Sequence, residues 1–333
     1  MHRKHNKENR PDTNSNQFMK HHLRLLLLAL AATGAACCSD AAKQETHPVE
    51  SVILITADGF SADVMRAHPG AFPRLEALAA RGISTLEARS VLPSSSAINW
   101  ATLLMGAGPE MHGFTDWGSR TPEAEPVATN EYGLFPGIFG EIRRQMPRAV
   151  TGAFYSWDGI GYLYEQPAAT MNFHSEGDDR LLAQEACRFL TEQRPDFAFI
   201  CFAQPDGAGH TFGWESDEYL AMCRTIDSLA GAVVECIDRT FDPERTAVIF
   251  TSDHGGTGLG HGGKTMHEMQ VPYMLVAPGI PAGTAFVREV MKYDNAPTVL
   301  ELLGLEVPAL WRGKSLLERL PKQEKTAEEK QVR

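Results

Sequence analysis

The chain has 333 residues, of which 43% are hydrophobic and 22% are charged, with 29 Gly and 20 Pro. This composition excludes wholesale disorder, collagen and coiled coil, and the length suits one large α/β domain or two small ones. The formal net charge of −11 argues against a protein that binds nucleic-acid duplexes, because phosphate backbones select basic surfaces. A small phosphorylated substrate is still compatible with this charge, provided that metal ions supply positive charge locally.

The N-terminal residues have the features of an export segment. Residues 25–32 read LLLLALAA, follow a basic cluster and precede small residues and Cys37. This order is typical of a secretory signal, and the apolar run is too short to cross a bilayer as a mature helix. Small residues directly before a Cys resemble a bacterial lipobox, although Gly34 stands where Leu or Val is usual. We therefore expect residues 1–38 to form a signal or lipoprotein segment, with Cys37 lipidated.

This expectation places the protein in the bacterial periplasm or at the cell surface, held to a membrane by its N-terminal lipid. Ordinary cleavage and a membrane-retained segment are the alternatives. Residues 1–18 are interpreted as an extension before the true start, and residues 39–50 as a flexible tether. Residues 51–318 are predicted to form one domain, and residues 319–333 a charged tail.

From residue 50 onward, short apolar runs alternate with longer amphipathic ones. The predicted strands are 51–58, 84–92, 149–156, 197–204, 246–253 and 273–278. The predicted helices are 72–81, 97–106, 135–146, 179–193, 216–239 and 294–303. Strands separated by helices predict an α/β fold, a three-layer sandwich whose mostly parallel sheet is covered on both faces. Residues 107–134 lack periodicity, and a loop of that length is usually functional.

The ends of three predicted strands carry the same chemistry. Asp-Gly follows the first strand, Asp-Gly-Ala-Gly-His follows the fourth, and Asp-His-Gly-Gly follows the fifth, with His-Gly-Gly a few residues later. Ligands of open α/β sheets bind beyond the carboxyl ends of the strands, and carboxylate with imidazole is a ligand set for zinc or a similar divalent ion. Six such ligands suit two ions that share a site. They are Asp58, Asp206, His210, Asp253, His254 and His261.

A nucleophile is available between the second strand and the next helix. Ser94, Ser95 and Ser96 lie where that helix begins, and plain helix capping is the alternative explanation for them. A helix N-terminus favours an anion, and a hydroxyl next to a divalent metal can ionise and attack. The same N–H groups and Asn99 are candidates to hold the phosphoryl oxygens of a substrate.

In their order along the chain, these pieces resemble the alkaline phosphatase superfamily, in particular its type I phosphodiesterase/nucleotide pyrophosphatase branch. The resemblance covers nearly all of residues 50–318. The matching segments are ITADGF (55–60), FPRLEALAARG (72–82), VLPSSSAINWATLLMGAGPEMHG (91–113), QPDGAGHTFG (204–213), TSDHGGTGLGHGG (251–263), VPYMLVAPGI (271–280) and DNAPTVLELLGLEVP (294–308).

The resemblance implies an alkaline-phosphatase-like catalytic domain with two zinc ions and a phosphoseryl intermediate. Ser96 falls on the nucleophile, with Ser95 as the alternative, and Asn99 falls on the residue that contacts a non-bridging phosphoryl oxygen. One zinc would lie between Asp58, Ser96, Asp253 and His254, and the other between Asp206, His210 and His261, with His261 preferred to His267. The charges of three carboxylates and one alkoxide would balance two divalent ions.

The sulfatase branch shares the fold but requires a Cys or Ser followed by x-Pro-x-Arg. The sequence Ser96-Ala97-Ile98-Asn99-Trp100 lacks both the Pro and the Arg, which argues against a sulfatase. The family branch favours a phosphodiesterase. The alternatives are a phosphomonoesterase like alkaline phosphatase, a phosphonate hydrolase, and a non-catalytic zinc-containing surface binding protein. Candidate contacts with the substrate, which also have an explanation as surface or core residues, are Trp117, Arg120, Trp157 and Lys264.

Overall fold

The structure, a computed structural model, describes residues 48–320. The expected signal segment, Cys37, most of the tether and residues 321–333 lie outside this range. All described residues belong to one compact unit. Among them, no helix is both long enough and apolar enough to cross a membrane.

An eight-stranded sheet forms the centre of this unit, in the order β4-β3-β5-β1-β6-β7-β2-β8. The strands are β1 (Ser51–Ala57), β2 (Ile83–Arg89), β3 (Thr151–Tyr155), β4 (Met171–His174), β5 (Phe197–Phe202), β6 (Thr246–Ser252), β7 (Gln270–Val276) and β8 (Thr284–Ala285). Strands β4 to β6 in this order are parallel, and β7 runs antiparallel to both of its neighbours. The sheet is therefore mostly parallel, as the sequence predicts.

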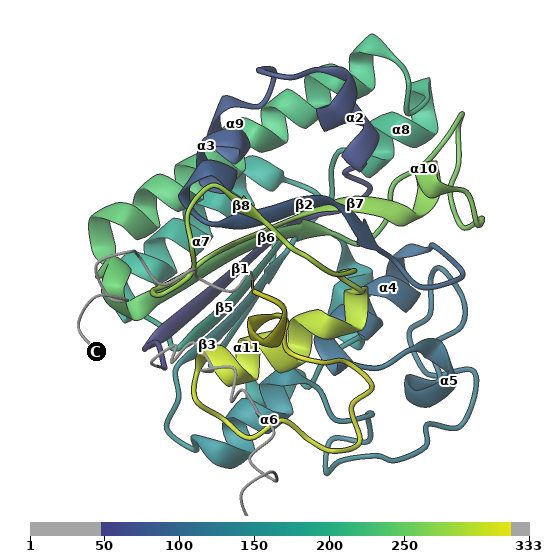
Figure 1. Cartoon of the computed structure of the whole chain (residues 1–333). Helices are drawn as coiled ribbons and strands as arrows, with labels where there is room; N and C mark the ends of the chain where they lie inside the picture. The colour runs from purple at the N-terminus through teal and green to yellow at the C-terminus, as the bar shows by residue number, and fades with distance from the viewer. Residues whose placement is uncertain (1–47, 321–333) are drawn as a thin grey trace, which may run out of the picture. The chain divides into compact units, whose positions relative to one another are not determined.

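Helices cover both faces of the sheet (Figure 1). They are α2 (Ala62–Ala67), α3 (Pro73–Arg81), α4 (Ser96–Met105), α5 (Pro109–His112), α6 (Ile138–Gln145), α7 (Asp179–Gln193), α8 (Asp206–Phe212), α9 (Asp217–Thr240), α10 (Met266–Met269) and α11 (Asn295–Leu302). Short 3₁₀ segments are η1 (Asp158–Tyr162), η2 (Gln166–Ala168), η3 (Pro243–Arg245), η4 (Lys292–Asp294) and η5 (Leu316–Arg319).

One hydrophobic cluster lies on each face of the sheet, and the side chains of β1 contribute to both. Val52 and Leu54 point into a cluster with α4, α6 and α11, whereas Ile53 and Ile55 point into a cluster with α3, α7 and α9. The strand is buried at every position rather than at alternate ones, which is the pattern of a central parallel strand. The three-layer α/β sandwich is thus confirmed.

The sequence pattern misses only short elements. Strands β4 and β8 and helices α2, α5, α8 and α10 have two to seven residues each, too few to show a period.

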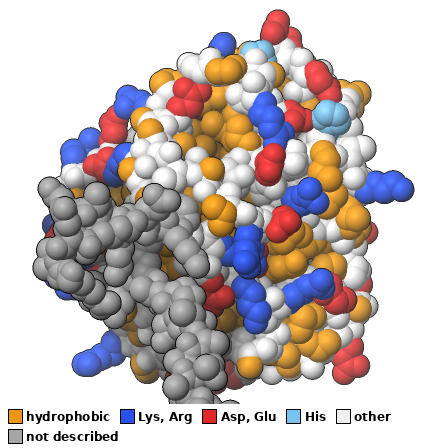
Figure 2. All heavy atoms as spheres, viewed as in Figure 1, with side chains coloured by type: hydrophobic (Ala, Val, Ile, Leu, Met, Phe, Trp, Pro, Cys, Tyr) orange, Lys and Arg blue, Asp and Glu red, His pale blue; other side chains and the backbone are white. Residues whose placement is uncertain are grey.

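On the face drawn in Figure 2, acidic, basic and hydrophobic side chains of the described residues are interspersed.

Candidate metal centre and active site

Three neighbouring strands deliver the acidic side chains to one edge of the sheet. Strands β5, β1 and β6 are adjacent and parallel, and their last residues are in register. Asp58 directly follows β1, Asp253 directly follows β6, and Asp206 begins α8 a few residues after β5. The Asp206 N–H donates to the carbonyl of Asp58 at 3.1 Å. The strand register and this backbone hydrogen bond therefore bring the three residues close together.

The first donor group consists of Asp58, Asp253 and His254, all buried. Nε2 of His254 lies 3.4 Å from Oδ1 of Asp58 and 3.3 Å from Oδ2 of Asp253. The hydroxyl of Ser96, the first residue of α4, lies 3.1 Å from the same Nε2 atom. Two carboxylates, one imidazole and one hydroxyl thus converge on one point.

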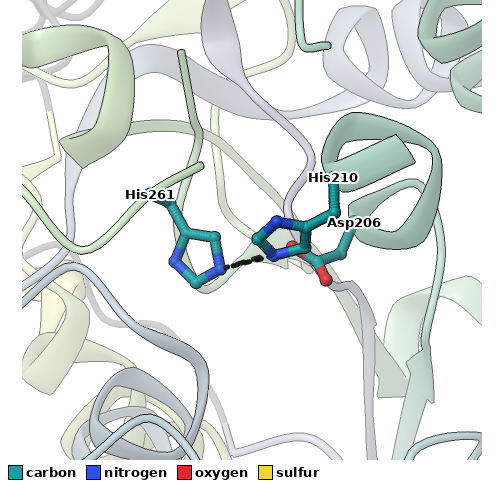
Figure 3. Close-up of side chains that lie close together, drawn as sticks. All are labelled: Asp206, His210 and His261. Carbon is teal, nitrogen blue, oxygen red and sulfur yellow. Dashed lines mark hydrogen bonds and ion pairs between the residues drawn. The ribbon is translucent and has the colours of Figure 1, made fainter. Parts of the chain in front are cut away.

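The second donor group consists of Asp206, His210 and His261 (Figure 3). Oδ1 of Asp206 lies 3.5 Å from Nε2 of His210 and 3.6 Å from Nε2 of His261. This group is more open, since the side chain of His210 is 44% exposed. His267 is not part of it, because its Nδ1 atom pairs with Asp63 at 2.5 Å. The structure thus brings together the six ligands that the sequence predicts.

The two donor groups lie against each other. The rings of His254 and His261 stack with centroids 3.6 Å apart and planes at 16°. Gly59 makes the close approach possible, because it has φ +68° and a Cβ atom there would lie 2.9 Å from Cα of Asp206. A residue other than glycine would both strain the backbone and collide with the second group.

All three histidines direct the same ring nitrogen to the backbone. Nδ1 lies 2.8 Å from the carbonyl of Gly255 for His254, 3.0 Å from Leu259 for His210, and 3.0 Å from Ser94 for His261. A carbonyl only accepts, so each Nδ1 carries the proton and each Nε2 presents a lone pair. Nε2 of His210 and Nε2 of His261 are only 3.1 Å apart. Two facing lone pairs at that distance call for a cation.

The carboxylates point to the same conclusion. Among the described residues, four buried side-chain oxygens lack a hydrogen-bond partner, and three of them belong to Asp58, Asp206 and Asp253. A buried acceptor without a partner is costly, and natural proteins leave few. The donor set therefore fits divalent metal ions.

Burial also controls the protonation of the first group. It raises the pKa of Asp253 to about 6, and burial followed by repulsion from Asp253 raises the pKa of Asp58 well above its ordinary value. Burial lowers the pKa of His254 and that of His261 to about 4. At neutral pH the imidazoles are neutral and ready to bind a cation.

The structure distinguishes the three serines. Ser96 faces His254, whereas Ser95 is the N-cap of α4 and makes no side-chain capping bond. Oγ of Ser95 lies 3.0 Å from the position that a Cβ atom on Gly262 would take. Ser94 bonds the loop that carries His261. Ser96 is the serine next to the donor groups.

The Asn99 side chain makes hydrogen bonds within its own turn. Its side chain is buried, and its Oδ1 accepts from the N–H of Val91 at 2.7 Å. Its Nδ2 lies within 3.3 Å of the carbonyls of Val91, Pro93 and Ser95. The amide thus fixes the turn before Ser96. A bond to a phosphoryl oxygen would have to replace one of these, and it stays a prediction.

Sequence reasoning did not find Trp100. Its indole N–H donates to Oδ2 of Asp58 at 3.1 Å, and the ring is buried against Phe199. The signal was present, because residues four apart on a helix share a face and Trp100 follows Ser96 by four. Trp100 therefore orients a carboxylate of the first donor group from the helix that carries Ser96.

Of the four candidate substrate contacts, Trp117 and Lys264 lie on segments bonded to the serine turn. The Trp117 carbonyl accepts from the Ala97 N–H at 3.1 Å, so this N–H of α4 is already occupied, and the Trp117 side chain is 65% exposed. Lys264 is exposed and follows Gly263, whose carbonyl accepts from Ser94.

The other two candidates make contacts within the protein. Arg120 pairs with Asp158 at 2.6 Å, and its guanidinium lies over the ring of Tyr162, 4.9 Å from the centroid. Trp157 is half-buried and packs against the cluster that includes α4. Of the two candidate cations for a phosphate dianion, Arg120 and Lys264, Arg120 is thus paired with a carboxylate.

A mostly parallel α/β sheet with two carboxylate and histidine groups at its carboxyl edge defines a fold of the alkaline-phosphatase-like class with candidate metal sites. The family model described as type I phosphodiesterase / nucleotide pyrophosphatase matches residues 52–270. The chain belongs to this family, as the resemblance indicates.

Curated relatives agree with this assignment. The chain is similar to ectonucleotide pyrophosphatase/phosphodiesterase family member 7 of Mus musculus, with 26% identity over 72% of the chain and 56% of the relative. It is also similar to venom phosphodiesterase of Macrovipera lebetinus, with 25% identity over 68% of the chain and 27% of the relative. The chain thus spans about half the length of the first relative and about a quarter of the second.

Solved structures show the same fold. Murine ectonucleotide pyrophosphatase/phosphodiesterase 5, an inactive variant in complex with AMP, has a TM-score of 0.66 at 15% identity, over 82% of this chain and 100% of that chain. A phosphonate monoester hydrolase from Silicibacter pomeroyi has a TM-score of 0.65 at 16% identity, over 84% and 78%. A 2-O GAG sulfatase has the same TM-score at 16% identity, over 84% and 76%. At these identities the likeness concerns the fold alone.

Proposed function

We propose that the protein hydrolyses phosphoric diesters through a covalent phosphoseryl intermediate on Ser96, with two divalent ions, zinc by preference. The observation that carries the proposal is the position of the Ser96 hydroxyl. It lies 3.1 Å from Nε2 of His254, beside two buried carboxylates that have unpartnered oxygens. A hydroxyl placed among metal-binding groups is an activated nucleophile.

In this proposal the two donor groups hold one ion each. Bound there, the ions would supply positive charge that lowers the pKa of the attacking hydroxyl and stabilises the leaving oxygen. The residues are Asp58, Asp253, His254 and Ser96 for one ion, and Asp206, His210 and His261 for the other. Zinc is favoured because it commonly binds the nitrogen atoms of imidazoles and the oxygen atoms of carboxylates.

The reaction then follows from the residues. Ser96 Oγ forms a bond to phosphorus while the bond from phosphorus to the first alcohol breaks, and the proton lost by Ser96 leaves on that alcohol by way of solvent. Water then attacks phosphorus and breaks the Oγ–P bond; its hydroxyl stays on the released phosphate monoester and its proton returns to Ser96. The Nδ1 bonds to backbone carbonyls hold each imidazole so that Nε2 faces this reaction.

The preference for diesters is supported by the ion pair of Arg120. A monoester dianion usually needs a free cation at its non-bridging oxygens, and Arg120, one of the two candidate cations, is paired with Asp158. A diester carries a single negative charge and needs less compensation. The family to which the chain belongs is named for phosphodiester and pyrophosphate bonds.

The test compares turnover of bis-p-nitrophenyl phosphate and p-nitrophenyl phosphate by the zinc-loaded protein. We expect a strong preference for the diester, with a p-nitrophenyl phosphoryl group on Ser96 trapped by acid quench and located by mass spectrometry. A preference for the monoester would overturn the diester assignment. Zinc binding without turnover of either ester would point to phosphonates or to a non-catalytic role.

We also propose that the protein is exported and anchored by a lipid on Cys37. The support is the order of basic, apolar and small residues before that cysteine. Mass spectrometry of the N-terminal peptide from a bacterial membrane fraction tests the proposal. An acylated Cys37 is expected, and an unmodified N-terminus in the soluble fraction would contradict it.

A further inference from the structure

We propose that Ser94 is a positioning residue that fastens the loop bearing His261 to the nucleophile turn, and thereby sets the affinity of the Asp206, His210 and His261 group for its metal ion. The inference rests on the proposed function and adds to it a residue that does not touch the metal. It starts from three hydrogen bonds that join residues 94 and 261–263.

The hydroxyl of Ser94 has both of its partners on this loop. It donates to the carbonyl of Gly263 at 2.7 Å and accepts from the N–H of Gly262 at 3.1 Å. The carbonyl of Ser94 lies 3.0 Å from Nδ1 of His261. One buried residue therefore holds the backbone on one side of the imidazole and the imidazole itself.

Helix capping does not explain this hydroxyl. The N-cap of α4 is Ser95, and Ser94 lies one residue outside the helix. Its side chain is satisfied as donor and acceptor by a segment more than 160 residues away in the sequence. The contact is thus a tertiary one between two parts of the active site.

The loop needs such a fastening because His261 belongs to neither a strand nor a helix. His210, its partner in the same donor group, is held by α8. Gly262, the residue after His261, has φ +104°, which lies outside the backbone conformations of helices and strands. Downstream, the N–H of Gly263 is held by the carboxylate of Glu268 at 2.7 Å. Ser94 provides the tie on the side of the nucleophile.

Partners that orient a metal ligand typically account for about 10- to 100-fold in metal affinity. Ser94→Ala should therefore weaken one zinc equivalent by about that factor and leave the other unchanged, because His254 is held independently through Gly255. The value of kcat should fall while KM changes little, since the substitution misplaces a ligand and removes no substrate contact.

The experiment titrates zinc into the metal-free full chain in competition with a chelator, for wild type and Ser94→Ala. Ser94→Thr, which keeps a hydroxyl, should restore affinity, and Ser95→Ala is the matched control next to it. Equal weakening of both equivalents, or a lower Tm with unchanged zinc affinity, would show that Ser94 supports only the fold and would overturn the inference.

A second measurement needs no metal. Nitrogen-15 NMR of the metal-free histidines reports which ring nitrogen of His261 carries the proton. Loosening of the bond to the Ser94 carbonyl in Ser94→Ala should shift the His261 signals away from the pure Nδ1–H tautomer, and unchanged signals would contradict the inference. If wild type binds two zinc ions without hydrolysing esters, the proposed function fails while the zinc titration still decides the role of Ser94.

Discussion

The Ser96 hydroxyl lies 3.1 Å from Nε2 of His254, where the start of α4 meets the end of β6. The two residues are 158 positions apart in the sequence. Their contact joins the hydroxyl to a donor group of two carboxylates and one imidazole. A serine that caps a helix is common, whereas a serine beside two carboxylates and an imidazole is a candidate nucleophile.

Ser96→Ala should reduce kcat for bis-p-nitrophenyl phosphate by at least about 10³-fold, because it removes the hydroxyl that lies 3.1 Å from Nε2 of His254. Zinc content should stay near that of wild type, since the carboxylates and imidazoles remain. Stopped assays together with metal analysis measure both quantities. Ser95→Ala is the control and should keep most of the activity. Full activity of Ser96→Ala would rule out this nucleophile.

The two donor groups should lose their metal ions separately. Asp206→Asn should abolish tight binding at the more open group, while Asp58→Asn should do so at the buried group, because each substitution removes one anionic ligand. Metal analysis after dialysis should give about one ion per chain in either variant. Loss of both ions from Asp206→Asn would mean that the groups act as one unit.

The stabilisation by zinc should depend on pH. The pKa of Asp253 is about 6 and that of Asp58 is raised, so protons compete with the metal below pH 6, whereas the imidazoles of His254 and His261 stay neutral down to about pH 4. The increase in Tm on adding zinc should be greatest above pH 6 and shrink as the pH falls through that value. Calorimetry with and without zinc at pH 5 and pH 7.5 measures it. An increment that grows on acidification would contradict the prediction.

Trp100→Phe should weaken metal binding at the first donor group by about 10- to 100-fold. The variant keeps an aromatic ring in the core but loses the indole N–H that holds Asp58 at 3.1 Å. Competition with a chelator measures the affinity. Trp117→Phe is the matched control, because the exposed Trp117 side chain makes no such bond. Equal affinities of the Trp100→Phe variant and wild type would show that Asp58 needs no such support.

Release of Arg120 should shift the preference between esters. Asp158→Ala removes the carboxylate that pairs with Arg120, and the freed guanidinium can then attract a phosphate dianion. The ratio of monoester to diester turnover should rise roughly 3- to 10-fold. Arg120→Ala alone and the double variant should keep the wild-type ratio. A rise in the double variant as well would assign the effect to Asp158 itself.

The sequence predicts the α/β fold and the six metal ligands because both depend on simple rules. The carboxyl ends of parallel strands meet at one edge of the sheet. Residues that follow these strands, here Asp58, Asp206 and Asp253, are therefore expected to lie close together. The antiparallel direction of β7 does not follow from such a rule, since its sequence is as apolar as those of the parallel strands β1, β5 and β6.

The sequence by itself thus determined the class of fold, the side chains that form the two donor groups and the segment that carries the candidate nucleophile. The tertiary structure decided which of three adjacent serines faces the donor groups, that the amide of Asn99 is bonded to its own turn, and that Arg120 is paired with Asp158. The physical reason is the distance along the sequence over which each feature is determined. Strand ends and helix starts are set by local patterns, whereas hydrogen bonds across loops depend on side-chain directions that no local pattern records.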